Sequence, residues 1–206
     1  VVGNNLSVAS SLTGAWTLIR NTHPVSNGFA HRAEDQFIYG FPLFSNHLYK
    51  IGVSTRTDLG AVTNLPVQQY VGADIDPATG LLYVVSKSGS VYVVNIETRT
   101  ATSFTLHTTG GAGRQKVGRD IAIVGGKIWS VGTNYILQAD IATGNVTKFS
   151  GLNVGTMGAM WVNADNSVSA QVKATGAIYT LAVPVSNTVL EGTMATGSQI
   201  DGATCR

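Results

Sequence analysis

The chain has 206 residues, of which 12% are charged and 24 are glycines, and its formal net charge is +2. A positive charge this small and scattered argues against a nucleic-acid partner, which needs a dense basic surface. No apolar run approaches the roughly 18–20 residues that span a bilayer, so we expect no membrane partner.

The predicted elements begin with the end of a repeating unit. Residues 11–17 (SLTGAWT) match residues 141–147 (IATGNVT), so the N-terminal segment is expected to enter at the third strand of a unit. Complete units follow at about residues 28–65, 71–106, 117–149 and 157–190. Residues 202–206 begin like the first strand of a further unit.

The second unit shows most clearly how each repeat is built. We expect strands at 72–76, 81–86, 91–96 and 101–106, joined by turns at 77–80, 87–90 and 97–100. Turn residues at these spacings between β-branched runs are typical of an antiparallel meander.

Five glycines mark the repeat at intervals of roughly 40–46 residues: Gly28, Gly72, Gly118, Gly158 and Gly202. Tyr39, Tyr83, Trp129 and Ser169 follow the first four at a constant distance, and the aromatic ones are expected to pack between neighbouring sheets. Periods of this length, made of four short β-runs, indicate propeller blades. We therefore predict one all-β domain over residues 1–206, a five-bladed β-propeller whose fifth blade combines residues 202–206 with 5–20.

We call these five glycines the phase glycines, and polar residues follow them in some units but not in others. With period-two alternation, the pattern is expected to gather Arg32, Asp74, Asp76, Asp120 and Arg206 near the propeller axis, with His31 and Arg119 close by. We consider three interpretations of this axial cluster: an internal ion-pair network, a site for a ligand or a cation such as calcium, and a catalytic carboxylate pair.

Other patterns carry less chemistry. The four histidines are scattered and Cys205 is the one cysteine, so no zinc-type spacing occurs. We expect the protein to bind no cofactor, because the glycine-rich residues 110–116 (GGAGRQK) lack the spacing of a phosphate loop. That basic stretch is instead expected to be an insertion, either a binding loop or a solvated connector. The three glutamates, Glu34, Glu97 and Glu191, are expected in turns or outer strands, which disfavours a catalytic assignment.

Several segments resemble a group of secreted, largely fungal propeller domains of unknown function. They are DQFIYG (35–40), LYKI (48–51), GADID (72–76), GLLYV (80–84) and DGATC (201–205). Five-bladed closure is also similar to that of tachylectin-type lectins, a likeness of architecture alone.

These observations favour an extracellular binding protein with lectin-like recognition of a carbohydrate or glycoprotein. Its ligand site is expected at Arg32, His31, Asp74, Asp76, Asp120 and Arg119, with no catalytic residue assigned. Two alternatives stay open: a hydrolase that acts on glycans or esters through the axial carboxylates, and a structural or surface-interaction domain without a small ligand. Secretion is expected because the chain begins at Val1 and contains two glycosylation acceptor triplets, at Asn5 and Asn145.

Overall fold

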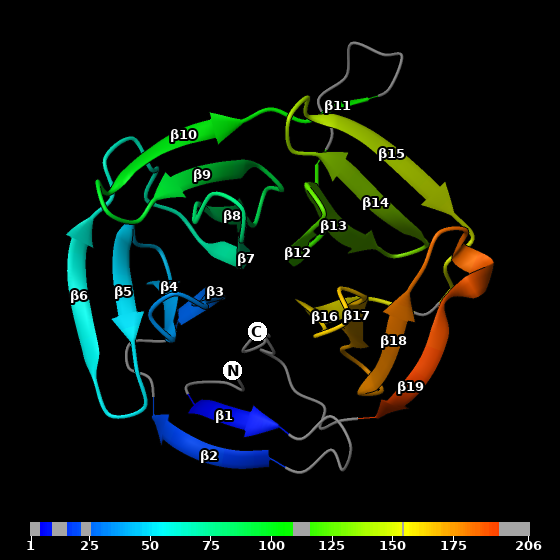
Figure 1. The fold of residues 1–206 in the computed structure, drawn as a ribbon, viewed down its shortest axis with the longest axis horizontal. Coiled ribbons are helices and arrows are strands. Elements are labelled where there is room, and N and C mark those ends of the chain that lie inside the picture. Colours follow the sequence, from blue (N-terminus) through cyan, green and yellow to red (C-terminus); the bar gives the residue numbers. More distant parts are fainter. Residues whose placement is uncertain (1–4, 10–15, 22–25, 109–115, 154, 194–206) are drawn as a thin grey trace.

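The computed structural model describes residues 5–9, 16–21, 26–108, 116–153 and 155–193, with the backbone alone up to residue 26. Its strands form a ring of four blades around a common axis, and a two-stranded hairpin lies in the remaining sector (Figure 1). Within the described ranges, no helix is long and apolar enough to cross a membrane.

Each blade is an antiparallel meander with its first strand nearest the axis. Blade 1 contains β3 (Ser26–Arg32), β4 (Phe37–Pro42), β5 (His47–Ile51) and β6 (Arg56–Ala61). Blade 2 contains β7 (Tyr70–Ile75), β8 (Leu82–Ser86), β9 (Val91–Asn95) and β10 (Thr100–Phe104). The strands of blade 2 agree with the predicted strands at 72–76, 81–86, 91–96 and 101–106 to within two residues at each end.

Blades 3 and 4 repeat the arrangement. Blade 3 contains β12 (Ile121–Val124), β13 (Lys127–Gly132), β14 (Tyr135–Asp140) and β15 (Asn145–Ser150). A short strand β11 (His107–Thr108) pairs in parallel with β15 and brings the chain in from blade 2. Blade 4 contains β16 (Met157–Val162), β17 (Val168–Val172), β18 (Ala177–Leu181) and β19 (Val189–Thr193), with a 3-10 turn at Val185–Asn187.

The prediction of five blades was wrong, because the described residues form four blades, each with a meander of four antiparallel strands. The N-terminal segment forms the hairpin of β1 (Asn5–Ala9) and β2 (Trp16–Asn21), which is a two-stranded sheet of its own. The predicted composite blade also needed an inner strand from residues 202–206, and these lie outside the described residues. A hairpin supplies two of the four strands that each blade of this ring contains, so it does not count as a fifth blade.

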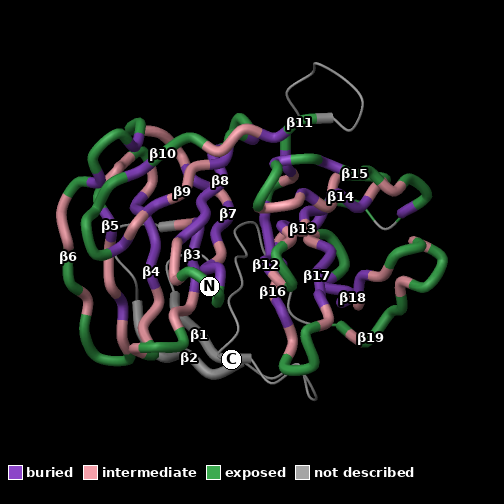
Figure 2. The backbone as a smooth tube through the Cα atoms, turned by 45° about the horizontal axis from the view of Figure 1, so that its top comes forward, coloured by how far each residue is buried: buried purple, intermediate pink, exposed green. Residues whose placement is uncertain are grey.

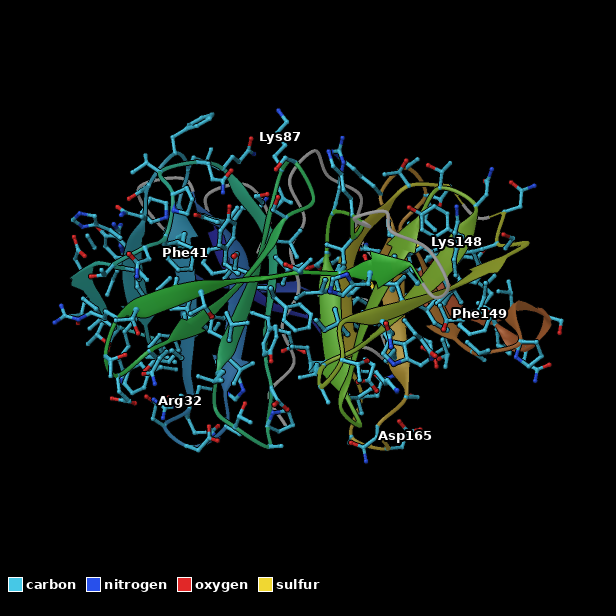
Figure 3. All side chains as sticks on the ribbon, turned by 90° about the horizontal axis from the view of Figure 1, so that it is seen from above. Arg32, Phe41, Lys87, Lys148, Phe149 and Asp165 are labelled. Carbon is cyan, nitrogen blue, oxygen red and sulfur yellow. The ribbon has the colours of Figure 1, made fainter. Side chains whose placement is uncertain are left out.

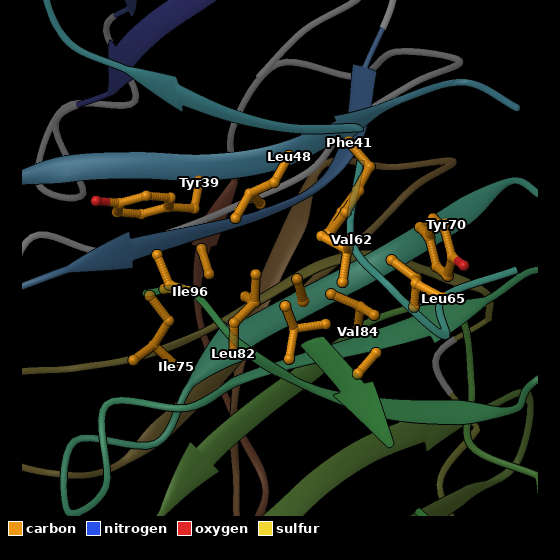
Figure 4. Close-up of a cluster of buried hydrophobic side chains, with 14 residues drawn as sticks. Tyr39, Phe41, Leu48, Val62, Leu65, Tyr70, Ile75, Leu82, Val84 and Ile96 are labelled. Carbon is orange, nitrogen blue, oxygen red and sulfur yellow. The ribbon is translucent and has the colours of Figure 1, made fainter. Parts of the chain in front are cut away.

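Apolar clusters between neighbouring blades hold the ring together. Tyr39, Phe41 and Leu48 of blade 1 pack against Ile75, Leu82 and Val84 of blade 2, as Figure 4 shows. Equivalent clusters join blades 2 and 3 and blades 3 and 4. Buried residues therefore follow the strands closest to the axis, and exposed ones gather at the outer strands and loops (Figure 2). The aromatic marker residue Tyr39 is a packing residue, as predicted.

Candidate functional site

The six predicted ligand residues lie in or directly beside the inner strands of blades 1, 2 and 3. The blades stand radially around the axis (Figure 1), and successive side chains of an inner strand alternate between its two faces. The shared ligand site stays a prediction, and the contacts of each of the six residues show what it does in the fold.

Asp74 and Asp120 connect the inner strands of successive blades. Asp74 Oδ2 of blade 2 accepts a hydrogen bond from Ile123 N of blade 3, at 2.7 Å. Asp120 Oδ2, just before β12, accepts one from Met160 N of blade 4, also at 2.7 Å. Each carboxylate also accepts the amide N–H of the following residue, at 2.9 Å. Because an inner strand is the edge of its sheet, its amides need acceptors from elsewhere, and these carboxylates supply them.

Arg32 is the last residue of the inner strand β3, and Asp76 directly follows the inner strand β7. Asp120, in contrast, directly precedes its inner strand. Arg32 Nη1 donates to Glu97 Oε1 across the boundary between blades 1 and 2, at 2.5 Å, and this hydrogen bond raises the pKa of Arg32. Asp76 closes the β7–β8 turn by accepting hydrogen bonds from Ala78 N (3.1 Å) and Thr79 Oγ1 (2.7 Å). Both residues therefore have structural partners of their own.

His31 and Arg119 complete the predicted set. His31 is half-buried in β3, opposite Ile38 of β4. Arg119 is exposed and directly precedes Asp120, at the end of the inner strand where the chain enters blade 3. Of the six predicted residues, Arg119 is the one whose side chain is exposed and has no partner within the described residues. The predicted Arg206 lies outside them.

The phase glycines do not mark equivalent positions in every blade. Pairing places Asp74 opposite Tyr83 and Ala122 opposite Trp129, so Ala122, not Asp120, is the counterpart of Asp74. A two-residue turn joins β12 to β13, at Gly125 and Gly126, where six residues join β7 to β8. The shorter turn displaces the phase glycine by two residues, although its distance in sequence to the aromatic marker is unchanged.

In blade 4 the phase glycine is displaced by one residue. Residues at a given distance after it therefore lie on the opposite face of the strand from their counterparts in blade 2. Five residues join β16 to β17, one fewer than join β7 to β8, and this places Trp161 opposite Ser169, at the position that Asp74 takes in blade 2. Met160 packs in the apolar cluster between blades 3 and 4.

A polar network replaces the aromatic marker in blade 4, and sequence reasoning missed it. Asn163 Nδ2 donates to Ser169 Oγ at 2.7 Å, and Ser169 Oγ donates to Glu191 Oε2 at 3.1 Å. Trp161 Nε1 donates to Asn163 Oδ1 at 3.0 Å, and Thr180 Oγ1 donates to Glu191 Oε1. Glu191 lies in the outer strand, as predicted. The available signal was Ser169 itself, the one marker residue without a ring.

Charge separates the two ends of the ring. We call the loops β3–β4, β5–β6, β7–β8, β9–β10, β12–β13, β14–β15, β16–β17 and β18–β19 the lower loops, and those at the opposite strand ends the upper loops. Arg32 and Asp165 lie at the lower end in Figure 3, and Lys87 lies at the upper end. The lower loops and the strand ends beside them hold Glu34, Asp35, Asp76, Glu97, Asp140 and Asp165.

Most charges at the lower end are neutralised locally. Lys127 Nζ lies 2.6 Å from Asp140 Oδ2, and this ammonium, with Thr143, holds the pKa of the Asp140 carboxyl at about 2. Lys50 Nζ lies 2.9 Å from Asp35 Oδ2. Burial raises the pKa of Asp35, but hydrogen bonds from Tyr39 and Lys50 outweigh it and leave that pKa below its usual value.

The upper loops hold cations but few carboxylates. Among the described upper-loop residues the one carboxylate is Asp120, which is buried and bonded to backbone amides. The cations there are Lys87, Lys116, Arg119 and Lys173, and none of them takes part in an ion pair of the described residues. We call these four residues the upper cations.

Two upper loops of blade 1 present apolar side chains to solvent and are fastened to each other. Phe44 and Val67 are 69% and 67% exposed. Asn46 Nδ2 lies within hydrogen-bond reach of the carbonyl oxygens of Val62 and Leu65, at 3.4 and 3.3 Å, and Val62 N donates to the Asn46 carbonyl at 2.9 Å. These contacts fix the loops at residues 43–46 and 62–69, which we call the blade 1 platform.

The described residues show no grouping suited to metal binding. No cluster of three or more His, Cys, Asp or Glu side chains that could hold a metal ion occurs among them. The three carboxylates considered for calcium, Asp74, Asp76 and Asp120, accept hydrogen bonds from protein N–H and O–H groups. The basic insertion falls mostly at residues 109–115, outside the described residues.

Comparison with known proteins gives a family and a fold. Residues 7–206 match the family described as a repeat of unknown function (DUF6923). No curated protein matches the chain. A chain of the nidogen/laminin complex is similar in structure, with a TM-score of 0.65 and 14% identity over 95% of this chain and 78% of that chain.

Two further structures are similar over part of their own length. Hydrazine synthase of Kuenenia stuttgartiensis has a TM-score of 0.56 and 14% identity, over 80% of this chain and 49% of that one. An auxiliary nutrient binding protein from Bacteroides thetaiotaomicron has a TM-score of 0.55 and 16% identity, over 87% of this chain and 51% of that one. The chain thus spans about half the length of these two, and at such identities the similarity shows the fold alone.

Proposed function

The chain belongs to the DUF6923 family of repeats of unknown function, and we propose from its own geometry that it is a binding protein. Its ligand is a carbohydrate or the glycan of a glycoprotein, recognised in a lectin-like manner by the upper loops. We further propose that it acts outside the cell, where such ligands are displayed.

The blade 1 platform is the observation that carries this proposal. Phe44 and Val67 offer exposed apolar surface on loops that hydrogen bonds already hold in place. An exposed ring suits the apolar face of a sugar, and the amides and hydroxyls of neighbouring loop residues suit its hydroxyl groups. Loops fixed before binding lose little conformational entropy when the ligand arrives.

The carboxylates offer less support for the hydrolase alternative. A glycosidase needs two carboxyl groups free to act on one bond, and Asp74 and Asp120 each accept a hydrogen bond from the next blade. Two structural neighbours are described by their complexes or ligands, a nidogen/laminin complex and a nutrient binding protein. They are in keeping with a binding role and name no ligand for this chain.

A glycan array tests the proposal with a matched pair of variants. Phe44→Asn removes the exposed ring of the platform and suits its positive φ of 57°. Val53→Asn removes a side chain that is 75% exposed in a lower loop. We expect the wild type and Val53→Asn to bind the same glycans, and Phe44→Asn to bind them about tenfold more weakly, the loss of roughly one apolar contact. Equal binding by both variants, or no glycan bound by the wild type, would overturn the proposal.

A further inference from the structure

The upper cations lie in the upper loops of blades 2, 3 and 4. Lys87 and Lys173 take equivalent positions in blades 2 and 4, each directly after the second strand of its blade. Lys87 N donates to the carbonyl of Gln69, which precedes β7, and Lys173 N donates to that of Thr156, which precedes β16. Both lysines therefore stand beside the start of an inner strand.

The other two cations lie between these blades. Arg119 precedes the inner strand β12 of blade 3. Its carbonyl oxygen and the Cα of Asp120 lie so close to Gly72 that a Cβ there would be 2.7 and 2.6 Å from them. Lys116 lies against Gly89 of the loop that follows Lys87, since a Cβ on Gly89 would be 2.7 Å from the Lys116 Cβ. The four cations thus lie at the upper ends of blades 2, 3 and 4.

Like charges on one face repel each other and lower the stability of the free protein unless a counter-charge is near. At the lower end the chain supplies that counter-charge itself, as in the Lys127–Asp140 and Arg32–Glu97 pairs. At the upper end the one described carboxylate, Asp120, is used to connect blades 3 and 4. The separation of charge along the axis therefore favours an anionic ligand on one face only.

We propose that the upper cations bind an acidic polysaccharide, one with carboxylate or sulfate groups along its chain. This inference rests on the proposed function and names the class of carbohydrate. A polysaccharide fits better than a nucleic acid, because four cations on a chain with a net charge of +2 and a pI of 8.7 give a charge density below that of a nucleic-acid-binding domain. Such a ligand could reach the blade 1 platform on the same face, where its apolar ring faces meet Phe44.

Binding to immobilised polysaccharides of matched length tests this inference. The probes are dextran, which is neutral, polygalacturonate, which is carboxylated, dextran sulfate, and duplex DNA as a polyanion of another class. One variant combines Lys87→Gln with Lys173→Gln, and its matched control combines Arg56→Gln with Lys127→Gln at the lower end. Both double variants lower the net charge by two, so a difference between them reports position rather than total charge.

We expect the wild type to bind polygalacturonate or dextran sulfate more tightly than dextran, with affinity falling as salt rises. The upper double variant should bind at least about fivefold more weakly, and the lower one should bind like the wild type. Equal binding of dextran and the acidic probes, insensitive to salt, would overturn this inference while leaving the proposed function intact. Tight binding of DNA alone would overturn it in favour of a nucleic acid. Binding of no probe would also overturn this inference, while the glycan array decides the proposed function separately.

Discussion

The connection that Asp120 makes between blades 3 and 4 can be tested by truncation. Asp120 is 3% exposed, and its two oxygens accept the amide hydrogens of Met160 and Ile121 at 2.7 and 2.9 Å. The change Asp120→Ala removes both bonds and leaves two amides without an acceptor in a place that water reaches poorly. A hydrogen bond to a charged group contributes about 1.5–3 kcal/mol net.

The carboxylate also loses hydration when it is buried in the native protein, which offsets part of the two contributions. We therefore expect Asp120→Ala to lower the free energy of unfolding by about 3 kcal/mol. For a domain of this size, each kcal/mol corresponds to a change in Tm of about 2–4 °C. The melting temperature should thus fall by about 6–12 °C, measured by differential scanning calorimetry.

Asp165→Ala is the matched control. Asp165 also accepts two hydrogen bonds, from Ser167 N (2.9 Å) and Ser167 Oγ (2.6 Å), but in an exposed lower loop where water can replace it. Its effect on Tm should be much smaller. Hydrogen exchange of the Met160 amide should speed up in Asp120→Ala and stay unchanged in Asp165→Ala. Equal Tm shifts in the two variants, or an unchanged Met160 amide, would refute the connecting role of Asp120.

Two further predictions concern close packing and charge. Gly72→Ala should lower the free energy of unfolding by about 1–3 kcal/mol in urea titration, because its Cβ would lie 2.6 Å from Asp120 Cα. Gly192→Ala, where no atom lies within 4 Å, should change it little, and equal effects would contradict the close approach. The carboxyl carbon of Asp140 should titrate by NMR with a pKa of about 2, since Lys127 favours the charged form. Because this folded-state pKa is lowered, the stabilising contribution is present above about pH 4 and is lost as the pH falls towards 2. Lys127→Ala should return the pKa towards 3.8, and an unchanged titration would refute the assignment.

The sequence was sufficient to predict the strands and turns but not the number of blades in the ring. The β-runs of the second unit and the loop at 87–90 were placed correctly, because turn residues and β-branched runs are local signals. The number of blades depends on which strands pair, and the match between residues 11–17 and 141–147 says nothing about pairing. The hairpin of β1 and β2 has the sequence pattern of a blade segment without making a blade.

The candidate site was partly predictable for a related reason. The sequence singled out Asp74 and Asp120 as breaks in the repeat, and both do have a special place, as acceptors for the next blade. Their hydrogen bonds to the next blade depend on the radial arrangement of the blades, and the place of Asp120 in its blade depends on the shorter turn at Gly125. The spacing of residues in the sequence reveals neither. The upper cations lie far apart in the sequence, and only the alternation of upper and lower loops places them at the same end of the ring.

Amide chemical-shift mapping with an oligogalacturonate tests the central claim most directly, namely that ligand binds at the upper end of the ring. We predict shifts confined to the upper loops, at residues 43–46, 62–69, 87–90, 116–119 and 173–176. Shifts centred on the lower loops, at residues 33–36, 96–99 and 163–167, or no shifts in any loop, would contradict it.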